Sequence, residues 1–391
     1  MRILLKIALG ITFIFSSLSF INTANALDIV FAEDRPDLRT LDPRITQSRH
    51  EEMLIVNMFD QLISADSEGN IYPGLATSWD VSSDGLEYTF SLRDDVSFHD
   101  GTKFNAAAVK ATFDSIVDPE TGSQGAVDIL GPYKETIVID DFTAKVVFER
   151  RYGSAITAFT ETELSIVSPT ALDKLGNEGF GMAPVGTGPF MFKNWEANKK
   201  VELVRNPDYN WAPEYMDGSG PSQVENLTYR LIKDTSTRVA ALEAGEIDIA
   251  ELVPPLDMRR FDSSGDLSTV TGTVSGLPYS AFLNTTTGVF QDVNVRKAFF
   301  HSLDRVKMTS DLFFGYAEAA FGPISSSTPS YWSGNEDYYP YNPEGAAALL
   351  DEAGWKMGSD GVREKNVEKL TAVSYTHLRA HETREDRVCR R

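Results

Sequence analysis

The sequence predicts an α/β protein built from two lobes. Patterns of period two, as in Glu87–Leu92, alternate along the chain with patterns of helical spacing, as in Asn105–Ile116. A chain of 391 residues is too long for one hydrophobic core, which favours two lobes. The net charge of −21 favours solubility and argues against nucleic acid or an anionic membrane surface as a partner.

The first 26 residues are typical of a secretory signal peptide. Arg2 and Lys6 precede an apolar run, residues 7–21, and Ala24-Asn25-Ala26 is a small-x-small cleavage site. We therefore expect the mature chain to begin near Leu27. Cysteine is absent near this site, so we expect a periplasmic protein that is not lipid-anchored.

The last 18 residues, Ser374 to Arg391, differ in composition from the rest of the chain. They contain five arginines and the only cysteine, Cys389. We interpret residues 374–391 as a non-native tail, with a basic helical C-terminus as the alternative. Without this tail the chain has no cysteine, so neither disulfides nor thiolate metal sites are expected.

The mature chain opens with a short apolar strand, Leu27–Ala32. A polar loop with Pro36 and Pro43 follows, and residues 51–62 then show near-helical spacing of apolar side chains. These patterns predict a strand, a loop and a helix in that order.

The most informative segment is Gly74–Phe104, which reads GLATSWDVSSDGLEYTFSLRDDVSFHDGTKF. Tyr88, Phe90 and Leu92 alternate with polar residues, which predicts a half-buried strand between two polar turns. We expect Trp79 to be a core residue, because it opens these strands. We expect His99, in the second turn, to make a structural hydrogen bond rather than to bind a metal.

Several later elements are predicted with defined ends. Asn105 is the expected N-cap of a helix, and residues 136–148 form an expected hairpin that turns at Asp140-Asp141. The segment Tyr341-Asn342-Pro343-Glu344 is expected to cap a helix that ends at Gly354. The remaining predicted elements are strands at Thr228–Lys233 and Tyr279–Asn284 and a helix at Thr235–Ala244.

The run Pro184-Val185-Gly186-Thr187-Gly188-Pro189-Phe190 predicts a fixed turn. Its glycines and prolines favour a structural role over ligand contact. The run is not a dinucleotide fingerprint, because Met191 stands where the third glycine should be.

The sequence shows no catalytic constellation, so we expect neither an enzyme nor a cofactor. It contains no Gly-x-Ser-x-Gly elbow and no Walker loop. His50-Glu51-Glu52-Met53-Leu54 begins like a zinc-protease helix, but Leu54 replaces the second histidine, and we expect no metal site. Acidic pairs such as Asp94-Asp95 are expected to solvate turns.

Five segments, in order, resemble those of the family 5 extracellular solute-binding proteins, the peptide- and nickel-binding components of ABC importers. They are residues 74–104, residues 184–211, RVAALEAGEIDI (238–249), VNVRKA (293–298) with LDR (303–305), and YNPEGAAALLDEAG (341–354). The resemblance covers roughly Leu27 to Ala372.

This resemblance implies the type II periplasmic binding protein fold, in which mixed sheets with flanking helices form two lobes joined by a hinge. We expect lobe I at 27–264, with 57–181 as a subdomain, and a partial lobe II at 265–373. Family members continue further, so the second lobe is expected to be incomplete.

The function implied is that of a periplasmic receptor. It would bind di- or oligopeptides, or a similar small polar ligand, as a monomer and deliver them to the transmembrane subunits of an ABC permease. Receptors for a nickel chelate, an opine or an oligosaccharide remain open within the family. A secreted hydrolase is less favoured, because no nucleophile is paired with a base. A periplasmic chaperone is also less favoured, and stoichiometric binding of one small ligand would argue against it.

The resemblance also implies candidate ligand contacts in the loop after the first strand and in a segment near the hinge. An ordinary solvated loop is the alternative. The candidates are Glu33, Asp34, Arg35, Thr46, Gln47, Tyr279 and Asn284. The family's aspartate for the ligand's ammonium and arginine for its carboxylate come from a C-terminal region that this sequence does not contain, so no residue is assigned those roles.

Overall fold

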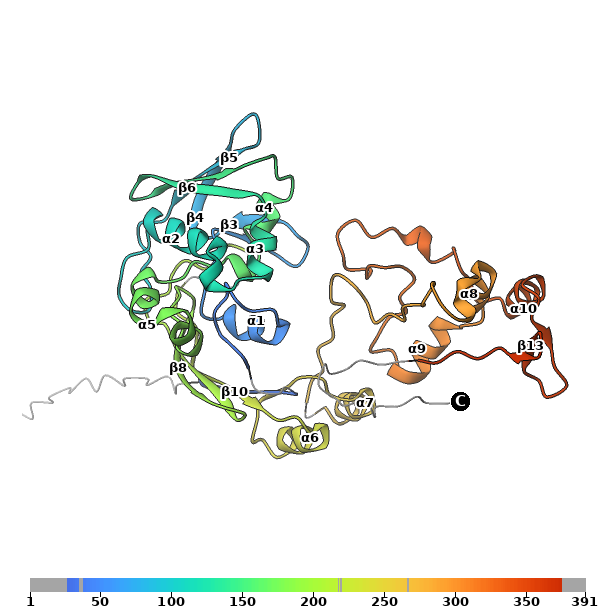
Figure 1. Ribbon diagram of the computed structural model, residues 1–391. Helices are drawn as coiled ribbons and strands as arrows, with labels where there is room; N and C mark the ends of the chain where they lie inside the picture. The colour runs from blue at the N-terminus through green and yellow to red at the C-terminus, as the bar shows by residue number, and fades with distance from the viewer. Residues whose placement is uncertain (1–26, 35–37, 217, 219, 266, 375–391) are drawn as a thin grey trace, which may run out of the picture. The chain divides into compact units, whose positions relative to one another are not determined.

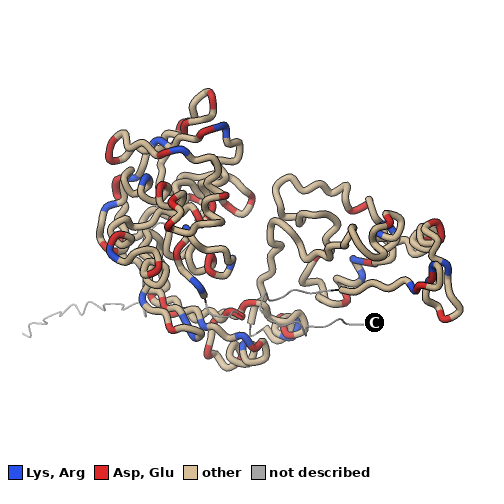
Figure 2. Tube along the Cα trace, viewed as in Figure 1, with Lys and Arg blue, Asp and Glu red and all other residues tan. Residues whose placement is uncertain are grey.

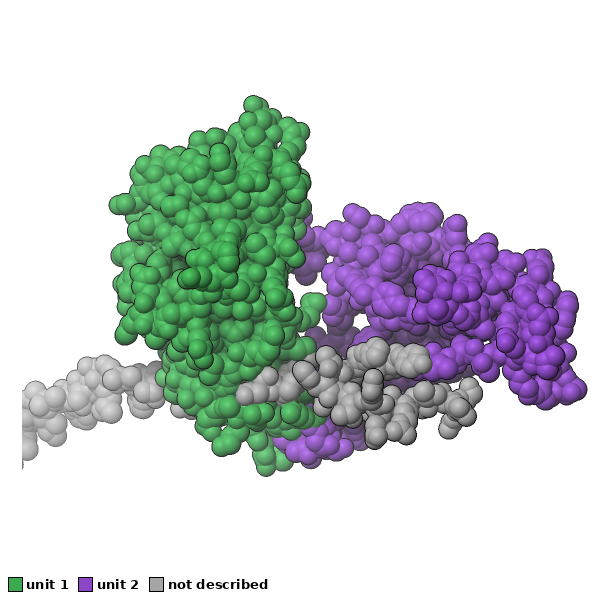
Figure 3. All heavy atoms as spheres, in the orientation of Figure 1, with its two compact units in different colours: residues 1–64, 72–233, 244–249 green, residues 65–71, 234–243, 250–391 purple. Residues whose placement is uncertain are grey.

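The computed structural model describes residues 27–374, except 35–37, 217, 219 and 266 (Figure 1). The expected signal peptide and the expected non-native tail therefore lie outside the described residues, apart from Ser374. The chain divides into two compact units, drawn in different colours in Figure 3. Unit 1 contains residues up to 64, 72–233 and 244–249, and unit 2 contains 65–71, 234–243 and the residues from 250 onward.

A five-stranded mixed sheet with the order β11-β1-β10-β9-β8 forms the base of unit 1. β1 pairs with β10 in parallel, and β10, β9 and β8 pair antiparallel. The strands are β1 (Leu27–Glu33), β8 (Phe190–Glu196), β9 (Lys200–Arg205), β10 (Val224–Leu231) and β11 (Ile249–Ala250).

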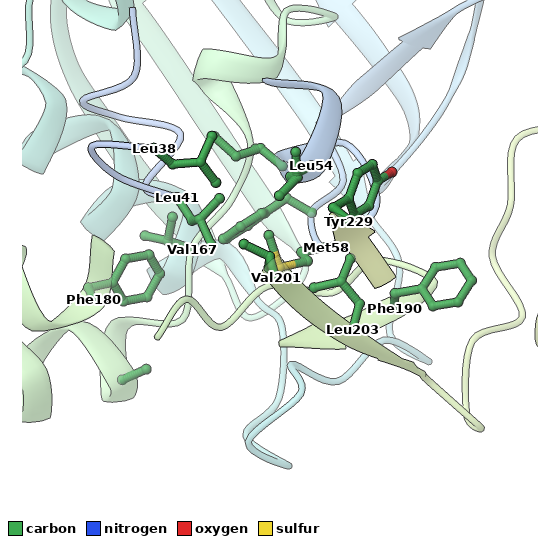
Figure 4. Packing of buried hydrophobic residues seen from close by; sticks show 13 residues of the cluster. Leu38, Leu41, Leu54, Met58, Val167, Phe180, Phe190, Val201, Leu203 and Tyr229 are labelled. Atoms are coloured by element: carbon green, nitrogen blue, oxygen red, sulfur yellow. The ribbon is translucent and has the colours of Figure 1, made fainter. Parts of the chain in front are cut away.

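One face of this sheet packs on the main core of unit 1. Figure 4 shows how side chains from the loop after β1, from helix α1 (Arg49–Ile55) and from β9 and β10 converge there. The buried members are Leu38, Leu41, Leu54, Ile55, Met58, Phe59, Val167, Ala171, Phe180, Phe190, Val201, Leu203 and Tyr229. Each large apolar side chain buried in this way stabilises the fold by about 1.5–3 kcal/mol.

A second sheet of unit 1 has the order β4-β5-β7-β6. Its strands are β4 (Ala76–Val81), β5 (Glu87–Leu92), β6 (Tyr133–Asp140) and β7 (Thr143–Phe148). Tyr88, Phe90 and Leu92 are buried, which confirms the predicted alternation, and β6 and β7 confirm the predicted hairpin. All four strands lie within the expected subdomain 57–181.

The prediction for Trp79 was wrong. Its side chain is only partly buried and does not belong to the core. Trp79 lies opposite Phe90, but β4 is the edge strand of the sheet. An edge strand has a neighbour on one side only, so a large side chain there keeps part of its surface in water.

Helices cover both sheets of unit 1. Asn105 caps α2 as expected, because its side chain accepts a hydrogen bond from the Ala108 N–H at 3.1 Å. The helices that follow α1 are α2 (Ala106–Val117), η1 (Pro119–Thr121), α3 (Gly125–Leu130), α4 (Ala155–Ala158), η2 (Thr162–Leu164) and α5 (Pro169–Met182). A short hairpin joins β2 (Ile63–Ala65) to β3 (Ile71–Pro73).

The regular elements of unit 2 are mostly short helices joined by long irregular segments, with one small sheet. Asn342 caps α10 as predicted, accepting from the Gly345 N–H at 2.9 Å. Its helices are α6 (Thr235–Glu243), α7 (Pro255–Ser264), η3 (Val289–Gln291), α8 (Val293–His301), α9 (Arg305–Phe313), η4 (Ser333–Asn335) and α10 (Pro343–Glu352). Its strands are β12 (Lys356–Met357), β13 (Arg363–Lys365) and β14 (Glu368–Lys369).

Two expectations for this part of the chain differ from the structure. Residues 279–284 do not form the predicted strand. Their apolar pattern is present, but a strand needs a hydrogen-bonded partner, and none pairs with them among the described residues. The helix α7 belongs to unit 2, whereas lobe I was expected to run to residue 264. The expected lobe limits remain a prediction.

Candidate functional site

The loop after β1, residues 34–48, carries most of the candidate contacts and is anchored by buried polar groups. Asp42 and Arg44 form a fully buried ion pair, with Arg44 Nη2 at 2.6 Å from Asp42 Oδ2. Arg44 also donates to Ser115 Oγ at 3.0 Å and to Asn177 Oδ1 at 3.1 Å. These bonds tie the loop to α2 and α5, so the loop has a defined conformation near its base.

Thr46 and Gln47 lie side by side in this loop but have different surroundings. Thr46 is buried and donates its hydroxyl to Glu51 Oε2 at 2.7 Å, which links the loop to α1. Gln47 is exposed, and its Nε2 donates to Gln124 Oε1 at 2.5 Å. Gln47 is therefore accessible to a ligand, whereas Thr46 positions the loop.

Glu33 and Asp34 end the first strand. Glu33 is completely buried, and its backbone carbonyl oxygen accepts a hydrogen bond from the Ile232 N–H at 2.8 Å. Burial of Tyr229 itself and the negative charge of Glu33 both raise the pKa of Tyr229. Asp34 is partly buried, and Arg35 lies outside the described residues. The roles of these residues as ligand contacts remain predictions.

Tyr279 and Asn284 belong to unit 2 and do not contact each other. The Tyr279 side chain is fully exposed. Asn284 is exposed, and its Oδ1 accepts from the Thr286 N–H at 2.9 Å and the Thr286 hydroxyl at 2.8 Å. This is a local turn, so the Asn284 amide oxygen already has partners.

The turn at residues 184–190 is structural, as expected. A Cβ atom added at Gly186 would collide with the Met58 carbonyl oxygen, and one at Gly188 would lie 2.5 Å from the Met58 carbonyl carbon. Only glycine permits this close approach of two backbone segments. The turn thus fixes the chain that follows α1 against the start of β8.

His99 joins the second polar turn of the strand region to this glycine turn. Its backbone N–H donates to the Gly186 carbonyl at 2.9 Å, and its Nε2 lies 2.9 Å from the Gly188 carbonyl oxygen. The Gly186 N–H donates to His99 Nδ1 at 3.4 Å, which places the proton of the neutral ring on Nε2. Burial lowers the pKa of His99 to about 4, although the bond to Gly188 opposes this shift.

Asp60 is a partly buried acceptor that the sequence did not reveal. Its Oδ2 accepts from the Thr187 hydroxyl at 2.7 Å and from Trp211 Nε1 at 3.0 Å, and its Oδ1 accepts from the Tyr209 hydroxyl at 3.1 Å. Burial raises the pKa of Asp60, and the three donors oppose this shift. Its partners lie more than 120 residues away in sequence, so no local pattern could have shown the cluster.

Three carboxylates of α1 and the neighbouring η2 region influence one another. Burial raises the pKa of Glu52, and the charges of Glu163 and Glu161 raise it further. The pKa of Glu161 is raised by burial and then by Glu163.

Acidic and basic residues are otherwise interspersed along the chain (Figure 2). Among the described residues, no three or more His, Cys, Asp and Glu side chains gather in a way that could hold a metal ion.

Comparison of this chain with known proteins identifies the family to which it is similar. A family model described as "Bacterial extracellular solute-binding proteins, family 5 Middle" matches residues 70–385. This match extends into the segment that we expected to be a non-native tail. The chain is 30% identical over 353 residues to the glutathione-binding protein GsiB of Shigella flexneri serotype 5b, covering 90% of this chain and 66% of that protein.

Solved structures show the same fold. NikA from Brucella suis, in complex with Fe(III)-EDTA, superposes with a TM-score of 0.75 at 26% identity, over 88% of this chain and 68% of that one. DppA from Helicobacter pylori, in complex with the peptide STSA, gives 0.68 at 27% identity, over 83% and 66%. The fold is therefore that of the type II periplasmic binding proteins, and the chain spans about two thirds of the length of these relatives.

Proposed function

Because the chain belongs to the family 5 bacterial extracellular solute-binding proteins, we propose that it is the solute receptor of an ABC importer. It binds a peptide, or a similar small polar solute, by closure of two lobes and passes it to the transmembrane subunits of the permease. The observation that carries this proposal is the family match over residues 70–385 together with the shared fold.

The ligand class rests on the relatives. One is a glutathione-binding protein, and another was solved with the peptide STSA. Both ligands are peptides with free charged ends. A second candidate class is a metal chelate or an opine, because other relatives of the same fold were solved with Fe(III)-EDTA and with agropinic acid.

The other parts of the proposal follow from the same membership. The relatives reported above are binding proteins, so the chain acts by binding and not by catalysis. It acts in the periplasm as a monomer, without nucleic acid as a partner. Within the described residues, none of the helices has both the length and the apolar character that crossing a membrane requires.

A ligand panel tests the proposal on the 391-residue protein. Dipeptides, glutathione and a nickel–histidine chelate are added at millimolar concentration, and the melting temperature and the heat of binding are measured. We expect the 391-residue protein to bind peptides weakly, because no residue is assigned the ammonium- and carboxylate-binding roles. The stabilisation should therefore stay below the roughly 2.7 kcal/mol that a ligand at 100 times its Kd supplies. Failure of all three classes to bind, or turnover of ester and peptide substrates, would contradict the proposal.

A matched pair of variants locates the contact. Gln47→Ala removes an exposed amide from the loop after β1, and Gln223→Ala removes an exposed amide elsewhere in unit 1. Loss of one hydrogen bond of about 1 kcal/mol should weaken peptide binding several-fold in the first variant only. Equal affinities for both variants would remove Gln47 from the site.

A further inference from the structure

The five-stranded sheet of unit 1 has a hollow of about 550 Å³ on the face opposite the main core. The register of the strands explains which side chains line it. Arg230 lies opposite Lys200, and Thr228 lies opposite Glu202 and beside Val30. Their neighbours Tyr229, Val201 and Leu203 point the other way, into the core. The volume falls within the range of about 300–1,000 Å³ that is usual for small-molecule sites.

Two cationic side chains lie opposite each other on adjacent strands, on the same face of this sheet. Lys200 and Arg230 are direct cross-strand partners, and like charges in that position destabilise a sheet. Lys200 is compensated, because its Nζ lies 3.3 Å from Glu196 Oε1 and 3.0 Å from Glu202 Oε1. Lys199 at the neighbouring turn also lines the hollow and is paired as well, with its Nζ 3.3 Å from Glu196 Oε2.

The positive charge of Arg230 is balanced by nearby carboxylates less well than that of Lys200. Its Nη1 donates to the Glu246 backbone carbonyl at 3.4 Å, and no carboxylate of the described residues forms an ion pair with its guanidinium. A guanidinium carries five N–H donors in a planar fork that matches the two oxygens of a carboxylate. Most of these donors are therefore available to a molecule in the hollow.

We propose that this hollow binds a small organic monocarboxylate, with the ligand's carboxylate on the Arg230 fork. Val30 and Ile232 line the same hollow and provide an apolar wall for a short hydrocarbon tail. The carboxylates of Glu202 and Glu246 also line it, and their charge disfavours a di- or trianion. All of these lining residues belong to unit 1, so the site does not depend on lobe closure.

The first experiment titrates the complete 391-residue protein with isovalerate and, separately, with its neutral amide. We expect saturable binding of isovalerate that weakens as the salt concentration rises, and at least tenfold weaker binding of the amide. Equal binding of acid and amide would overturn the proposal, because the carboxylate would then contribute nothing.

Matched variants assign the effect to Arg230. Arg230→Gln should weaken isovalerate binding at least tenfold, and Arg230→Lys should retain part of it, because the charge remains but the fork is lost. Arg205→Gln is the control, since Arg205 is on the neighbouring strand, pairs with Glu225 at 3.6 Å and does not line the hollow. Unchanged affinity in folded Arg230→Gln would overturn the assignment.

A chemical probe gives an answer even if Arg230→Gln does not fold. The unmodified protein is treated with phenylglyoxal, which reacts with accessible arginine, and the modified residues are identified by mass spectrometry. We expect isovalerate to slow modification of Arg230 at least threefold and to leave Arg205 unchanged. If Arg230 does not react even without isovalerate, a polypeptide segment covers the hollow and the small-molecule proposal is wrong.

Discussion

Unit 1 and unit 2 differ in how they bury their apolar side chains. The main core of unit 1 contains thirteen buried residues from a loop, helices and three strands. A core cluster of unit 2 contains three buried residues, Val295, Ala353 and Trp355. Large side chains such as Tyr279, Phe282 and Trp332 are instead mostly exposed in unit 2.

The two units also differ in their polar interactions. In unit 1 the Asp42–Arg44 pair is fully buried, and the partly buried Asp60 accepts three side-chain hydrogen bonds. In unit 2 Arg238 is also buried and donates to the Glu251 carbonyl at 2.8 Å, whereas the Lys307–Asp311 pair is exposed by 68% and 60% of its side chains. Buried, satisfied polar groups specify one arrangement, whereas exposed pairs contribute little. The comparison indicates that unit 1 holds most of the stability of the described chain.

The largest expected effect comes from the same substitution made in both units. Phe113 in α2 is fully buried and stacks on Phe159 with ring centroids 5.9 Å apart, and Phe282 in unit 2 is 81% exposed. Phe113→Ala should lower the free energy of unfolding by about 3–5 kcal/mol. Phe282→Ala should change it by less than about 0.5 kcal/mol. Denaturant unfolding followed by circular dichroism compares the two, and similar losses would remove the distinction between the units.

The next effect is a pH dependence carried by His99. Its pKa is about 4 in the folded state and 6.5 in the reference state, so the unfolded chain binds the proton more readily. The contribution of the neutral His99 ring to the free energy of unfolding is complete above pH 6.5. It is lost as the pH falls from 6.5 to about 4, and the total loss is about 3 kcal/mol. Unfolding measured across this range should show the loss.

The control for this prediction is His99→Gln, which lacks the titrating ring. Its stability should fall less steeply over the same pH range. The raised pKa of Asp60 acts in the opposite direction, since the folded state then takes up a proton more readily and gains stability as the pH falls. Identical slopes for the wild type and the variant would mean that His99 does not titrate differently in the folded state.

A smaller effect is expected for the acceptor at the centre of unit 1. Asp60→Asn keeps the shape but cannot accept from Thr187, Tyr209 and Trp211 together, so we expect a loss of about 1–3 kcal/mol. Asp311→Asn in unit 2 disrupts only an exposed pair and should cost less than about 0.5 kcal/mol. Thermal unfolding ranks the two variants, and an equal or larger cost for Asp311→Asn would reverse the comparison.

Local patterns predicted the elements whose partners are close in sequence. The alternation in β5, the hairpin of β6 and β7 and the caps Asn105 and Asn342 depend on neighbouring residues, and the structure confirms them. Trp79 and residues 279–284 were predicted wrongly, because edge position and strand pairing depend on distant segments. The same reason hid the Asp60 cluster. Asp42 and Arg44 are neighbours in sequence, but the contacts of Arg44 with Ser115 and Asn177, which bury the pair, depend on distant segments.

The candidate ligand contacts were predicted only as far as the family resemblance allowed. Sequence could place Thr46 and Gln47 in one loop, but not that Thr46 is buried against Glu51 while Gln47 remains exposed. That difference arises from the packing of the loop on α1, which no pattern within residues 33–48 specifies.

Amide hydrogen exchange of the 391-residue protein, read by mass spectrometry, tests most directly whether stability resides in unit 1. Peptides from β5, β7 and β9 should exchange slowly and together, because their hydrogen bonds open only when the core of unit 1 unfolds. Peptides from residues 267–288 and from α9 in unit 2 should exchange at least tenfold faster. Equal protection in both units, lost in one cooperative step, would contradict this account.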